Sequence, residues 1–372
     1  MAPIKVGILG LSTKPSAWAT LAHYPYLKSS EHYKIVAVCN SSLQTSQAAI
    51  DHFGLKDAKP HESQEAIAQD PEVELFVVST RADTHYEVAK PALLAGKSVY
   101  VEWPLGANKE QAREMADLAK KHGCKTIVGL QGRVAPSVLK VKEVVDSGRL
   151  GEIHSVSFQG TTNVWQDNAA GERYSYFMDR KVGGNLLTIY GGHIIDSITR
   201  AVGELDSWTT SAGNFRKQMK VKKTDGSYSE ESYDKDTPDQ MMLMGRLARS
   251  PPAMFNFHLR AGNKFTDQPG STWRVYGTKG ELQMTFTSAG PQIGRAAKIV
   301  ICDFEKGGEV TDITNEIDEG PGDRWTNLPE QGQNIGRLYE AFAIGKAGED
   351  YADWEHAVKR HEMIDGFYDT MI

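Results

Sequence analysis

The first 130 residues alternate short apolar runs with longer amphipathic stretches, and no other feature of the chain constrains its fold as strongly. The apolar runs are Ile4–Leu9, Lys34–Cys39, Leu75–Ser79, Ser98–Val101 and Thr126–Gly129. The stretches with apolar residues at helical spacing are Pro15–Lys28, Leu43–Phe53, Thr84–Leu94 and Lys109–Lys121. Strands that are separated by helices pair in parallel through right-handed crossovers, and helices cover both faces of such a sheet. The pattern predicts a doubly wound α/β domain over residues 1–130.

From about Pro136 onward, strand-like segments follow one another with few helices between them. These segments are Ile153–Thr162, Gln240–Leu247, Ala253–Leu259, Trp273–Tyr276, Glu281–Phe286 and Lys298–Phe304. The helix-like runs are Leu186–Ala201, Asn334–Ile344 and Trp354–Tyr368. Strands in series predict an α+β domain with a large, mostly antiparallel open sheet over residues 131–372. The polar stretch Lys217–Pro238 predicts a long surface loop or hairpin, and glycines predict a turn at 320–322.

Composition excludes several classes of protein. The chain has 42 basic and 48 acidic residues and a net charge of −6, which does not favour a nucleic-acid or membrane-surface binder. No apolar run approaches the roughly 20 residues of a membrane helix, and no signal peptide is visible. The three cysteines, Cys39, Cys124 and Cys302, are widely spaced. We therefore expect no disulfide scaffold and no metal site, and a cytoplasmic protein.

The turn after the first strand reads Gly10-Leu11-Ser12. In dinucleotide-binding folds, glycines at this turn let the backbone approach the pyrophosphate, which binds at the helix N-terminus. If Gly10 is the first glycine of this fingerprint, Ser12 replaces the second and Pro15 the third. A serine hydroxyl can still contact phosphate, and proline suits the first helical position. A plain strand–turn–helix connection is the alternative, and the place of the turn at the start of an α/β pattern favours dinucleotide binding.

The second predicted strand ends at Asn40-Ser41-Ser42. An acidic residue at this position would bind the adenosine ribose hydroxyls and indicate NAD. Asn40 carries no charge that would repel a 2′-phosphate, and the two serines could donate hydrogen bonds to one. The segment thus favours NADP slightly over NAD, although no arginine adjoins it and an ordinary polar turn is the alternative.

Four further motifs resemble one known family. They are Ser79–His85, Gly96–Pro104, the glycine-rich segment from Gly183 to His193, and Tyr276–Glu281. In this order they resemble the nicotinamide-dependent family of glucose–fructose oxidoreductase, inositol dehydrogenase and MocA, here called the Gfo/Idh/MocA family. Leu130–Arg133 and Val101–Trp103 look most like its branch of fungal galactose-regulon repressors. The resemblance implies that this branch keeps the fold and the dinucleotide site but acts by binding an activator protein.

The sequence departs from the family pattern at two positions. The family's active-site lysine corresponds to Trp103, and its motif aspartate corresponds to Ile189. A lysine can donate a proton to the reacting oxygen, whereas tryptophan cannot. The resemblance leaves His193 as the acid–base residue. On an ideal helix Tyr190 and Asp196 each lie three residues from His193, so Tyr190 could donate a proton and Asp196 could orient the imidazole.

Motif positions and residues just after predicted strands define the expected cofactor site. Its residues are Gly10, Leu11, Ser12, Asn40, Ser41, Ser79, Thr80, His85, Glu102, Trp103 and Gln131. The aromatic residues Trp165, Tyr174 and Tyr176 could line a substrate pocket or cover a domain junction.

Two functions follow from these patterns. One is an NAD(P)-dependent oxidoreductase that transfers hydride to or from a small carbonyl, hydroxyl or sugar-like substrate. The other is a catalytically silent NAD(P)-binding regulator that acts through a protein partner. The oxidoreductase is favoured because His193 and its neighbours are present. The resemblance also implies a homo-oligomer, either a dimer or a tetramer.

Overall fold

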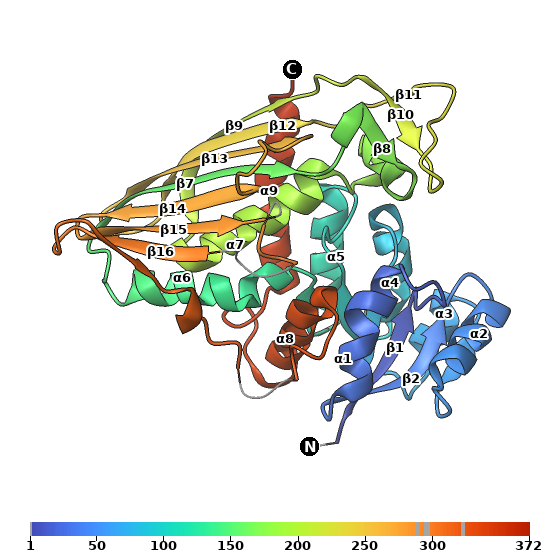
Figure 1. Cartoon of the computed structure of the whole chain (residues 1–372). Coiled ribbons are helices and arrows are strands. Elements are labelled where there is room, and N and C mark those ends of the chain that lie inside the picture. Colours follow the sequence, from blue (N-terminus) through green and yellow to red (C-terminus); the bar gives the residue numbers. More distant parts are fainter. Residues whose placement is uncertain (1, 288–289, 294–297, 321–323) are drawn as a thin grey trace. The chain divides into compact units, whose positions relative to one another are not determined.

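A computed structural model describes residues 2–287, 290–293, 298–320 and 324–372 (Figure 1). The chain forms two compact units. Unit 1 comprises Met1–Val134 and Gly320–Glu362, and unit 2 comprises Ala135–Glu319 and Met363–Ile372. The chain leaves unit 1 close to the boundary expected at residue 130, but it returns to this unit at 320–362, which the sequence pattern does not indicate. The turn expected at 320–322 lies for the most part outside the described residues.

Within the described part of unit 1, six strands form one parallel sheet in the order β3-β2-β1-β4-β5-β6. The strands are β1 (Ile4–Leu9), β2 (Tyr33–Cys39), β3 (Lys59–His61), β4 (Leu75–Val78), β5 (Ser98–Val101) and β6 (Thr126–Val128). The doubly wound α/β prediction is confirmed. The sequence pattern misses β3 because this three-residue strand is not fully buried and contains Pro60, so no apolar run marks it.

Helices of unit 1 surround this sheet. They are α1 (Tyr24–Ser29), α2 (Leu43–Phe53), α3 (Gln64–Gln69), α4 (His85–Leu94), α5 (Lys109–Lys121), α8 (Glu330–Ile344) and the first part of α9 (Trp354–Asp369). Helix α2 has its predicted bounds because Ser42 caps it, its Oγ accepting a hydrogen bond from the Thr45 amide. Helix α8, from the returning segment, packs beside α1 (Figure 1).

The helix predicted at Pro15–Lys28 is wrong in its first half. Residues 10–17 form a loop, a π-helix follows at Ala19–His23, and α1 begins only at Tyr24. Two hydrogen bonds close the loop: Thr20 Oγ1 donates to the Ser12 carbonyl at 2.6 Å, and the Ala17 amide donates to the Lys14 carbonyl at 3.0 Å. Pro15 is consequently a loop residue and does not occupy the first helical position.

Four tyrosines from distant segments pack together in the core of unit 1; Tyr26, Tyr33, Tyr100 and Tyr339 are called the tyrosine cluster below. The ring of Tyr339 stacks on Tyr100 at 5.1 Å and on Tyr26 at 5.8 Å, and the edge of Tyr33 approaches it at 5.2 Å. Each such aromatic pair contributes about 0.5–1.5 kcal/mol beyond its buried area. Tyr339 belongs to α8, so the cluster attaches the returning segment to the sheet.

Unit 2 is built on a sheet whose described strands have the order β17-β16-β15-β14-β7-β13-β12-β9. The strands are β7 (Ile153–Thr162), β9 (Leu205–Gly213), β12 (Gln240–Leu247), β13 (Ala253–Ala261), β14 (Ser271–Gly277), β15 (Gly280–Phe286), β16 (Lys298–Asp303) and β17 (Glu309–Asp312). Only the β7–β13 pairing is parallel among these described neighbours. Helices α6 (Pro136–Asp146) and α7 (Gly192–Val202) lie along one face of the sheet (Figure 1). The α+β prediction is confirmed.

Two segments of unit 2 differ from their predictions. The helix expected at Leu186–Ala201 is divided into a π-helix, Leu186–Gly191, and α7. Strands β10 (Gln218–Lys222) and β11 (Tyr233–Asp234) confirm a hairpin within Lys217–Pro238, and β8 (Ala169–Gly171) pairs with β10. This hairpin region is more than a surface loop, since Met219, Lys235 and Thr237 are buried. Among the described residues, no helix is both long enough and apolar enough to cross a membrane.

The tyrosine cluster predicts a loss of stability in alkaline solution. Burial raises the pKa of Tyr26, Tyr33, Tyr100 and Tyr339. In the unfolded chain these phenols ionise near pH 10, so above that pH the unfolded state releases protons that the folded state keeps. The free energy of unfolding should be constant with respect to this cluster below about pH 10. Above it, stability should fall by about 1.4 kcal/mol per pH unit for each of these tyrosines.

Urea denaturation between about pH 9 and pH 11 would measure this slope, and phenolate absorbance would report ionisation. Tyr33→Phe is the matched variant, and it should reduce the slope by the contribution of one tyrosine, about 1.4 kcal/mol per pH unit. Ionisation of the cluster before the protein unfolds would contradict the prediction.

Candidate functional site

Gly10 ends β1 in a conformation that a side chain would not tolerate. Its φ is +90°, and a Cβ at this position would lie 2.3 Å from the carbonyl oxygen of Ser79, at the end of β4. The Gly10 amide donates to the carbonyl of Cys39, at the end of β2, over 3.1 Å. Leu11 is fully buried beside it. The backbone therefore passes closely over the carboxyl ends of three neighbouring strands, where open α/β sheets bind their ligands.

The loop that follows carries polar groups suited to a phosphate. The hydroxyl of Ser12 accepts a hydrogen bond from the Lys14 amide at 3.2 Å, and Lys14 itself is exposed. Lys14 is a candidate that the sequence reasoning missed, and its only signal was a cation two residues after Ser12. Together, the close backbone, the hydroxyl and the cation fit a pyrophosphate group.

In the segment Asn40-Ser41-Ser42, fewer side chains are available to a ligand than the composition indicates. The Asn40 amide group donates to the carbonyls of Leu11, at 2.8 Å, and Thr45, at 3.2 Å, so it braces the loop. Ser42 is the cap of α2. Ser41 is exposed and makes no hydrogen bond to any described residue through its side chain, which leaves it as the hydroxyl of this segment that is open to a ligand.

Residues after β4 take two different roles. The Ser79 hydroxyl is buried and has no hydrogen-bond partner among the described residues. Thr80 Oγ1 lies 2.8 Å from Thr84 Oγ1. The ring nitrogens of the buried His85 lie 2.9 Å from the Pro104 carbonyl and 3.1 Å from the Thr80 carbonyl, and burial lowers the pKa of His85. His85 thus connects the ends of β4 and β5, whereas the hydroxyl of Ser79 has no partner in the described chain and could bond to a ligand.

Trp103, at the position of the family's lysine, is a buried residue with 4% of its surface exposed. Its indole packs against the imidazole of His361, on α9, with ring centres 4.8 Å apart. Burial, with a contribution from nearby His85, lowers the pKa of His361 to about 3, so this imidazole is neutral at physiological pH. The position where the resemblance places the family's lysine is thus occupied by a buried side chain that carries no charge.

Glu102 and Gln131 complete the predicted cofactor residues. Glu102 Oε1 accepts a hydrogen bond from the Tyr100 hydroxyl at 2.9 Å and lies 3.0 Å from Nε2 of His23. Gln131 follows β6 and is 1% exposed, and its Oε1 has no hydrogen-bond partner within the described chain. Buried polar atoms without partners are rare in folded proteins. The Ser79 hydroxyl and the Gln131 carbonyl, together with the Gly10 turn, therefore fit a bound dinucleotide that would satisfy them.

In unit 2, the predicted catalytic residues lie on or next to α7. His193 and Asp196 are buried on this helix, and the Ser197 hydroxyl donates to the His193 carbonyl at 2.7 Å. Tyr190 belongs to the preceding π-helix, so the spacing of an ideal α-helix does not describe its relation to His193. π-Turns within helices are frequent at functional sites.

The structure divides the predicted aromatic pocket residues between two clusters. Tyr174 and Tyr176 contact Phe177, whose ring lies 6.4 Å from that of Tyr190. Burial, with the charges that Tyr174 and Tyr176 would carry, raises the pKa of Tyr190 to about 12.

Trp165 lies with a buried lysine that sequence reasoning missed. Its ring centre is 4.5 Å from Nζ of Lys235, and its φ is +61°. Burial lowers the pKa of Lys235 to about 8, against the opposing effect of Asp239, and Nζ donates to Asn214 Oδ1 at 2.5 Å. Nothing in a polar, lysine-rich segment indicates that one of its lysines is buried.

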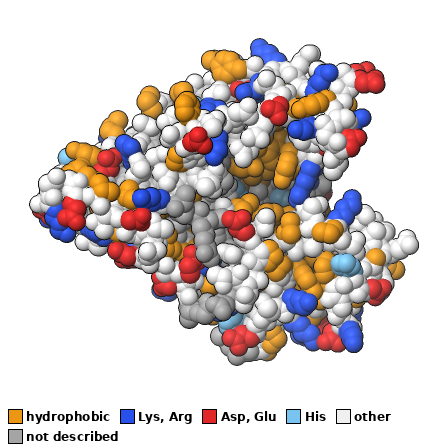
Figure 2. All heavy atoms as spheres, in the orientation of Figure 1, with side chains coloured by type: hydrophobic (Ala, Val, Ile, Leu, Met, Phe, Trp, Pro, Cys, Tyr) orange, Lys and Arg blue, Asp and Glu red, His pale blue; other side chains and the backbone are white. Residues whose placement is uncertain are grey.

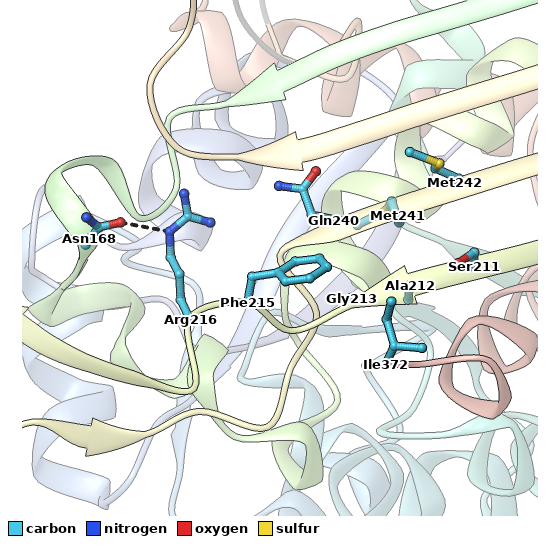
Figure 3. Close-up of a pocket in the computed structure, with 10 residues that line it drawn as sticks. All are labelled: Asn168, Ser211, Ala212, Gly213, Phe215, Arg216, Gln240, Met241, Met242 and Ile372. Carbon is cyan, nitrogen blue, oxygen red and sulfur yellow. Dashed lines mark hydrogen bonds between the residues drawn. The ribbon is translucent and has the colours of Figure 1, made fainter.

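A pocket of about 610 Å³ lies within unit 2, at the end of β9 and β12 (Figure 3). Arg216 points toward Asn168 at one end of it, with Nε donating to Oδ1 at 2.9 Å, and Phe215 and Gln240 lie next to Arg216. None of the predicted substrate residues lines this pocket. It has the size of a small-molecule site but is not the aromatic pocket that the sequence indicates.

Two family models match the chain. Residues 4–130 match an oxidoreductase family with an NAD-binding Rossmann fold, and residues 136–286 match the C-terminal domain of Gal80p. A dehydrogenase of Aspergillus oryzae, aclE, is 33% identical over 76% of this chain and 76% of its own length. The galactose/lactose regulatory protein GAL80 of Kluyveromyces lactis is 29% identical over 76% of this chain, and the match spans 64% of the regulator.

The fold is similar to that of a solved regulator. A crystal structure of a Saccharomyces cerevisiae Gal80p super-repressor mutant aligns with a TM-score of 0.87 and 23% identity, over 99% of this chain and 96% of the other. The sequence motifs, the two family models and the Aspergillus dehydrogenase all agree with this likeness. The chain therefore belongs to the Gfo/Idh/MocA oxidoreductase family, near its Gal80 branch.

Proposed function

We propose that this chain is an NAD(P)-dependent oxidoreductase that acts on a small carbonyl, hydroxyl or sugar-like substrate. The observation that carries the proposal is the set of unused polar groups at the carboxyl edge of the parallel sheet. The Gly10 turn leaves room for a ligand, and the Ser79 hydroxyl and Gln131 Oε1 are buried without partners in the described chain. Family membership and the dehydrogenase relative support the same reaction class.

The residues would have the following roles. Gly10, Ser12 and Lys14 bind the pyrophosphate, and Ser79 and Gln131 hydrogen-bond to the dinucleotide. When bound, the nicotinamide ring donates or accepts a hydride. His193 gives or takes the accompanying proton through its imidazole. The Tyr190 hydroxyl is protonated at neutral pH, as an ordinary phenol is, and burial raises its pKa further, to about 12. Tyr190 therefore acts as a hydrogen-bond donor that orients the substrate oxygen.

A silent NAD(P)-binding regulator is the second candidate, and two observations favour it. Trp103 replaces the family's lysine and is buried against the neutral His361, so no proton donor stands at this position. The relatives also include regulators of galactose metabolism. A regulator would keep the dinucleotide site and bind a protein partner without turnover.

His193→Ala separates the two candidates. In an enzyme, loss of a general acid–base group should lower turnover by ~10²–10⁴-fold. The dissociation constant of the dinucleotide should stay nearly the same, because His193 is not among the residues of the dinucleotide site. Steady-state NAD(P)H oxidation over a panel of carbonyl and sugar substrates gives the turnover, and calorimetry gives the dissociation constant.

Trp103→Lys is the companion variant. An enzyme adapted to the indole should lose activity, because a charge enters the buried site beside His361. A silenced relative would instead gain weak reductase activity. Wild-type protein that binds the dinucleotide but turns over none of the panel would contradict the enzyme and support the regulator.

We further propose that NADP(H) binds at least as tightly as NAD(H). Ser41 is the exposed hydroxyl at the start of α2, and no acidic residue stands at this turn. Ser41→Asp should weaken NADPH binding at least about tenfold, because like charges repel, and should leave NADH binding nearly unchanged. Ser41→Asn is the uncharged control. Asn40→Asp is a poorer test because it removes the hydrogen bonds to Leu11 and Thr45. A wild type that strongly prefers NADH would contradict this proposal.

We also propose that the chain forms a homo-oligomer through the open face of the large sheet. Met242, Met244 and Met254 project from neighbouring strands β12 and β13 and are 50–64% exposed. Hydrophobic side chains are visible at the upper left of Figure 2, where the large sheet lies. Such patches on soluble proteins often mark interfaces.

Met244→Lys should lower the molecular mass measured by sedimentation equilibrium toward that of the monomer, whereas Leu94→Lys on α4 should not. A Met244→Lys variant with the same measured mass as the wild type would refute this interface.

A further inference from the structure

The pocket at the end of β9 and β12 has a polar end and an apolar end. Arg216, Asn168 and Gln240 form the polar end, and the apolar side chains of Phe215 and Met242 lie beyond it (Figure 3). Phe215 is 68% exposed and Met242 is 50% exposed. All residues that line the pocket belong to unit 2, and its volume of about 610 Å³ suits a small molecule.

The side chains of the polar end present hydrogen-bond donors. Arg216 Nε donates to Asn168 Oδ1 at 2.9 Å, and neither Asn168 Nδ2 nor the two Nη groups of Arg216 hydrogen-bond to a described residue. Gln240 Oε1 lies 3.3 Å from Nε2 of His258, which leaves the amide nitrogen of Gln240 unused. Figure 3 shows this nitrogen turned toward Arg216. Because the oxygen of each amide already has a partner, this end favours a ligand that accepts hydrogen bonds.

The buried groups behind Arg216 do not neutralise it fully. Asp239 is 0% exposed, and its two oxygens each lie 3.5 Å from a cation, Oδ1 from Arg216 Nη1 and Oδ2 from Lys235 Nζ. Oδ2 also accepts hydrogen bonds from the backbone amides of Phe215 and Arg216. One carboxylate thus faces two cations. Gly262 leaves room for the guanidinium, because a Cβ there would lie 3.0 Å from Arg216 Nη2.

The more exposed neighbours do not reverse this balance. Arg260 lies directly opposite Gln240 in the β12–β13 pairing, is half-buried and has no ion pair with a described residue. Burial, with the charge of Arg260, lowers the pKa of His258, so this ring is neutral at physiological pH. Asp236 is exposed and its Oδ1 accepts a hydrogen bond from the Arg180 amide, so solvent screens its charge. The net charge at the polar end is positive, which favours an anion.

The loop that carries Asn168 is held in an unusual backbone conformation. Trp165, Asp167 and Asn168 have positive φ angles of 61°, 55° and 53°, which side chains rarely permit. The Trp165 ring packs on Nζ of Lys235 at 4.5 Å, and Arg216 bonds to Asn168. Strained residues that packing holds in place cluster at ligand sites. The donors of the polar end are therefore fixed before a ligand arrives.

We propose that this pocket binds a small organic carboxylate. The carboxylate accepts hydrogen bonds from Arg216 and Gln240, and the apolar body of the ligand lies along Phe215 and Met242. A planar guanidinium matches the geometry of a carboxylate, and an anion without an apolar body would leave the other end of the pocket unused. None of the residues proposed for the dinucleotide lines this pocket, so the inference does not depend on the proposed function.

The experiment measures dissociation constants for the full chain by ligand-observed NMR. The probes are hexanoate and benzoate, with hexan-1-ol and benzyl alcohol as the matched molecules that lack the charge, and inorganic phosphate as the anion that lacks the apolar body. For the wild type we expect a dissociation constant of about 0.1–1 mM for at least one carboxylate. Its matched alcohol and phosphate should each bind at least about tenfold more weakly, because each lacks one of the two recognised parts.

Three variants locate the binding. Arg216→Gln should weaken the carboxylate at least about tenfold, as expected for loss of a hydrogen bond between charged groups. Gln240→Leu removes one donor and keeps the cation, so it should weaken the carboxylate by about threefold to tenfold. Arg246→Gln is the matched control, because Arg246 is an exposed arginine of the same strand that pairs with Asp206 and does not line the pocket. It should bind the carboxylate as the wild type does.

A wild type that binds neither carboxylate more tightly than its alcohol would overturn the inference. Phosphate that binds as tightly as the carboxylates would also overturn it, because the apolar end would then contribute nothing. Unchanged carboxylate affinity in Arg216→Gln would place the ligand elsewhere. Thermal unfolding shows whether each variant folds, and if Arg216→Gln does not, unchanged affinity in Gln240→Leu would overturn the inference instead. A chain that binds a carboxylate but neither NADPH nor NADH would contradict the proposed function alone.

Discussion

Parallel pairing of the strands in unit 1 is the constraint on which the rest of the candidate site depends. Because every strand runs in the same direction, the chain segments after β1, β2, β4, β5 and β6 all emerge at one edge of the sheet. Gly10, Asn40, Ser79, Glu102 and Gln131 are the residues at or next to these ends. They are separated by up to about a third of the chain, yet the topology brings them to one edge. We propose that this edge binds the dinucleotide.

Packing within unit 1 makes this edge rigid. The Asn40 amide braces the loop after β1, His85 joins the ends of β4 and β5, and the tyrosine cluster attaches α8 to the same sheet. Hydrogen-bonding groups that are held by partners leave few ways for the remaining ones to move. The Ser79 hydroxyl and Gln131 Oε1 are among the buried polar atoms of the described chain that have no hydrogen-bond partner, and both follow strands of the parallel sheet.

The sequence predicts the fold well wherever local signals agree. The bounds of α2 and α5 are correct because a capping residue precedes each helix and the apolar periodicity begins with it. The bounds of β5 are correct because a short, largely buried apolar run marks this strand. The prediction fails where tertiary contacts decide. The hydrogen bond from Thr20 to the Ser12 carbonyl closes a loop at residues 10–17, so the first helix does not begin at Pro15. Helix α8 belongs to unit 1, where its Tyr339 packs in the tyrosine cluster, although it is far away in the sequence.

The candidate site shows the same division. Positions after strands are readable from the order of apolar runs, so Gly10, Ser79, Glu102 and Gln131 could be named in advance. The burial of Trp103 and Lys235 and the link from His23 to Glu102 could not, because each depends on residues far away in the sequence. The π-helix before α7 is likewise invisible to a pattern of ideal helical spacing.

We propose that a dinucleotide lies along the carboxyl edge of this sheet and hydrogen-bonds to the Ser79 hydroxyl and Gln131 Oε1. A crystal structure of the wild-type protein grown with NADPH, and with NADH in parallel, tests it most directly. We expect the pyrophosphate beside the Gly10 turn, with the Ser79 hydroxyl and Gln131 Oε1 hydrogen-bonded to the ligand. Dinucleotide density at another place on the molecule, or at this edge with both of those atoms still unpaired, would contradict the account.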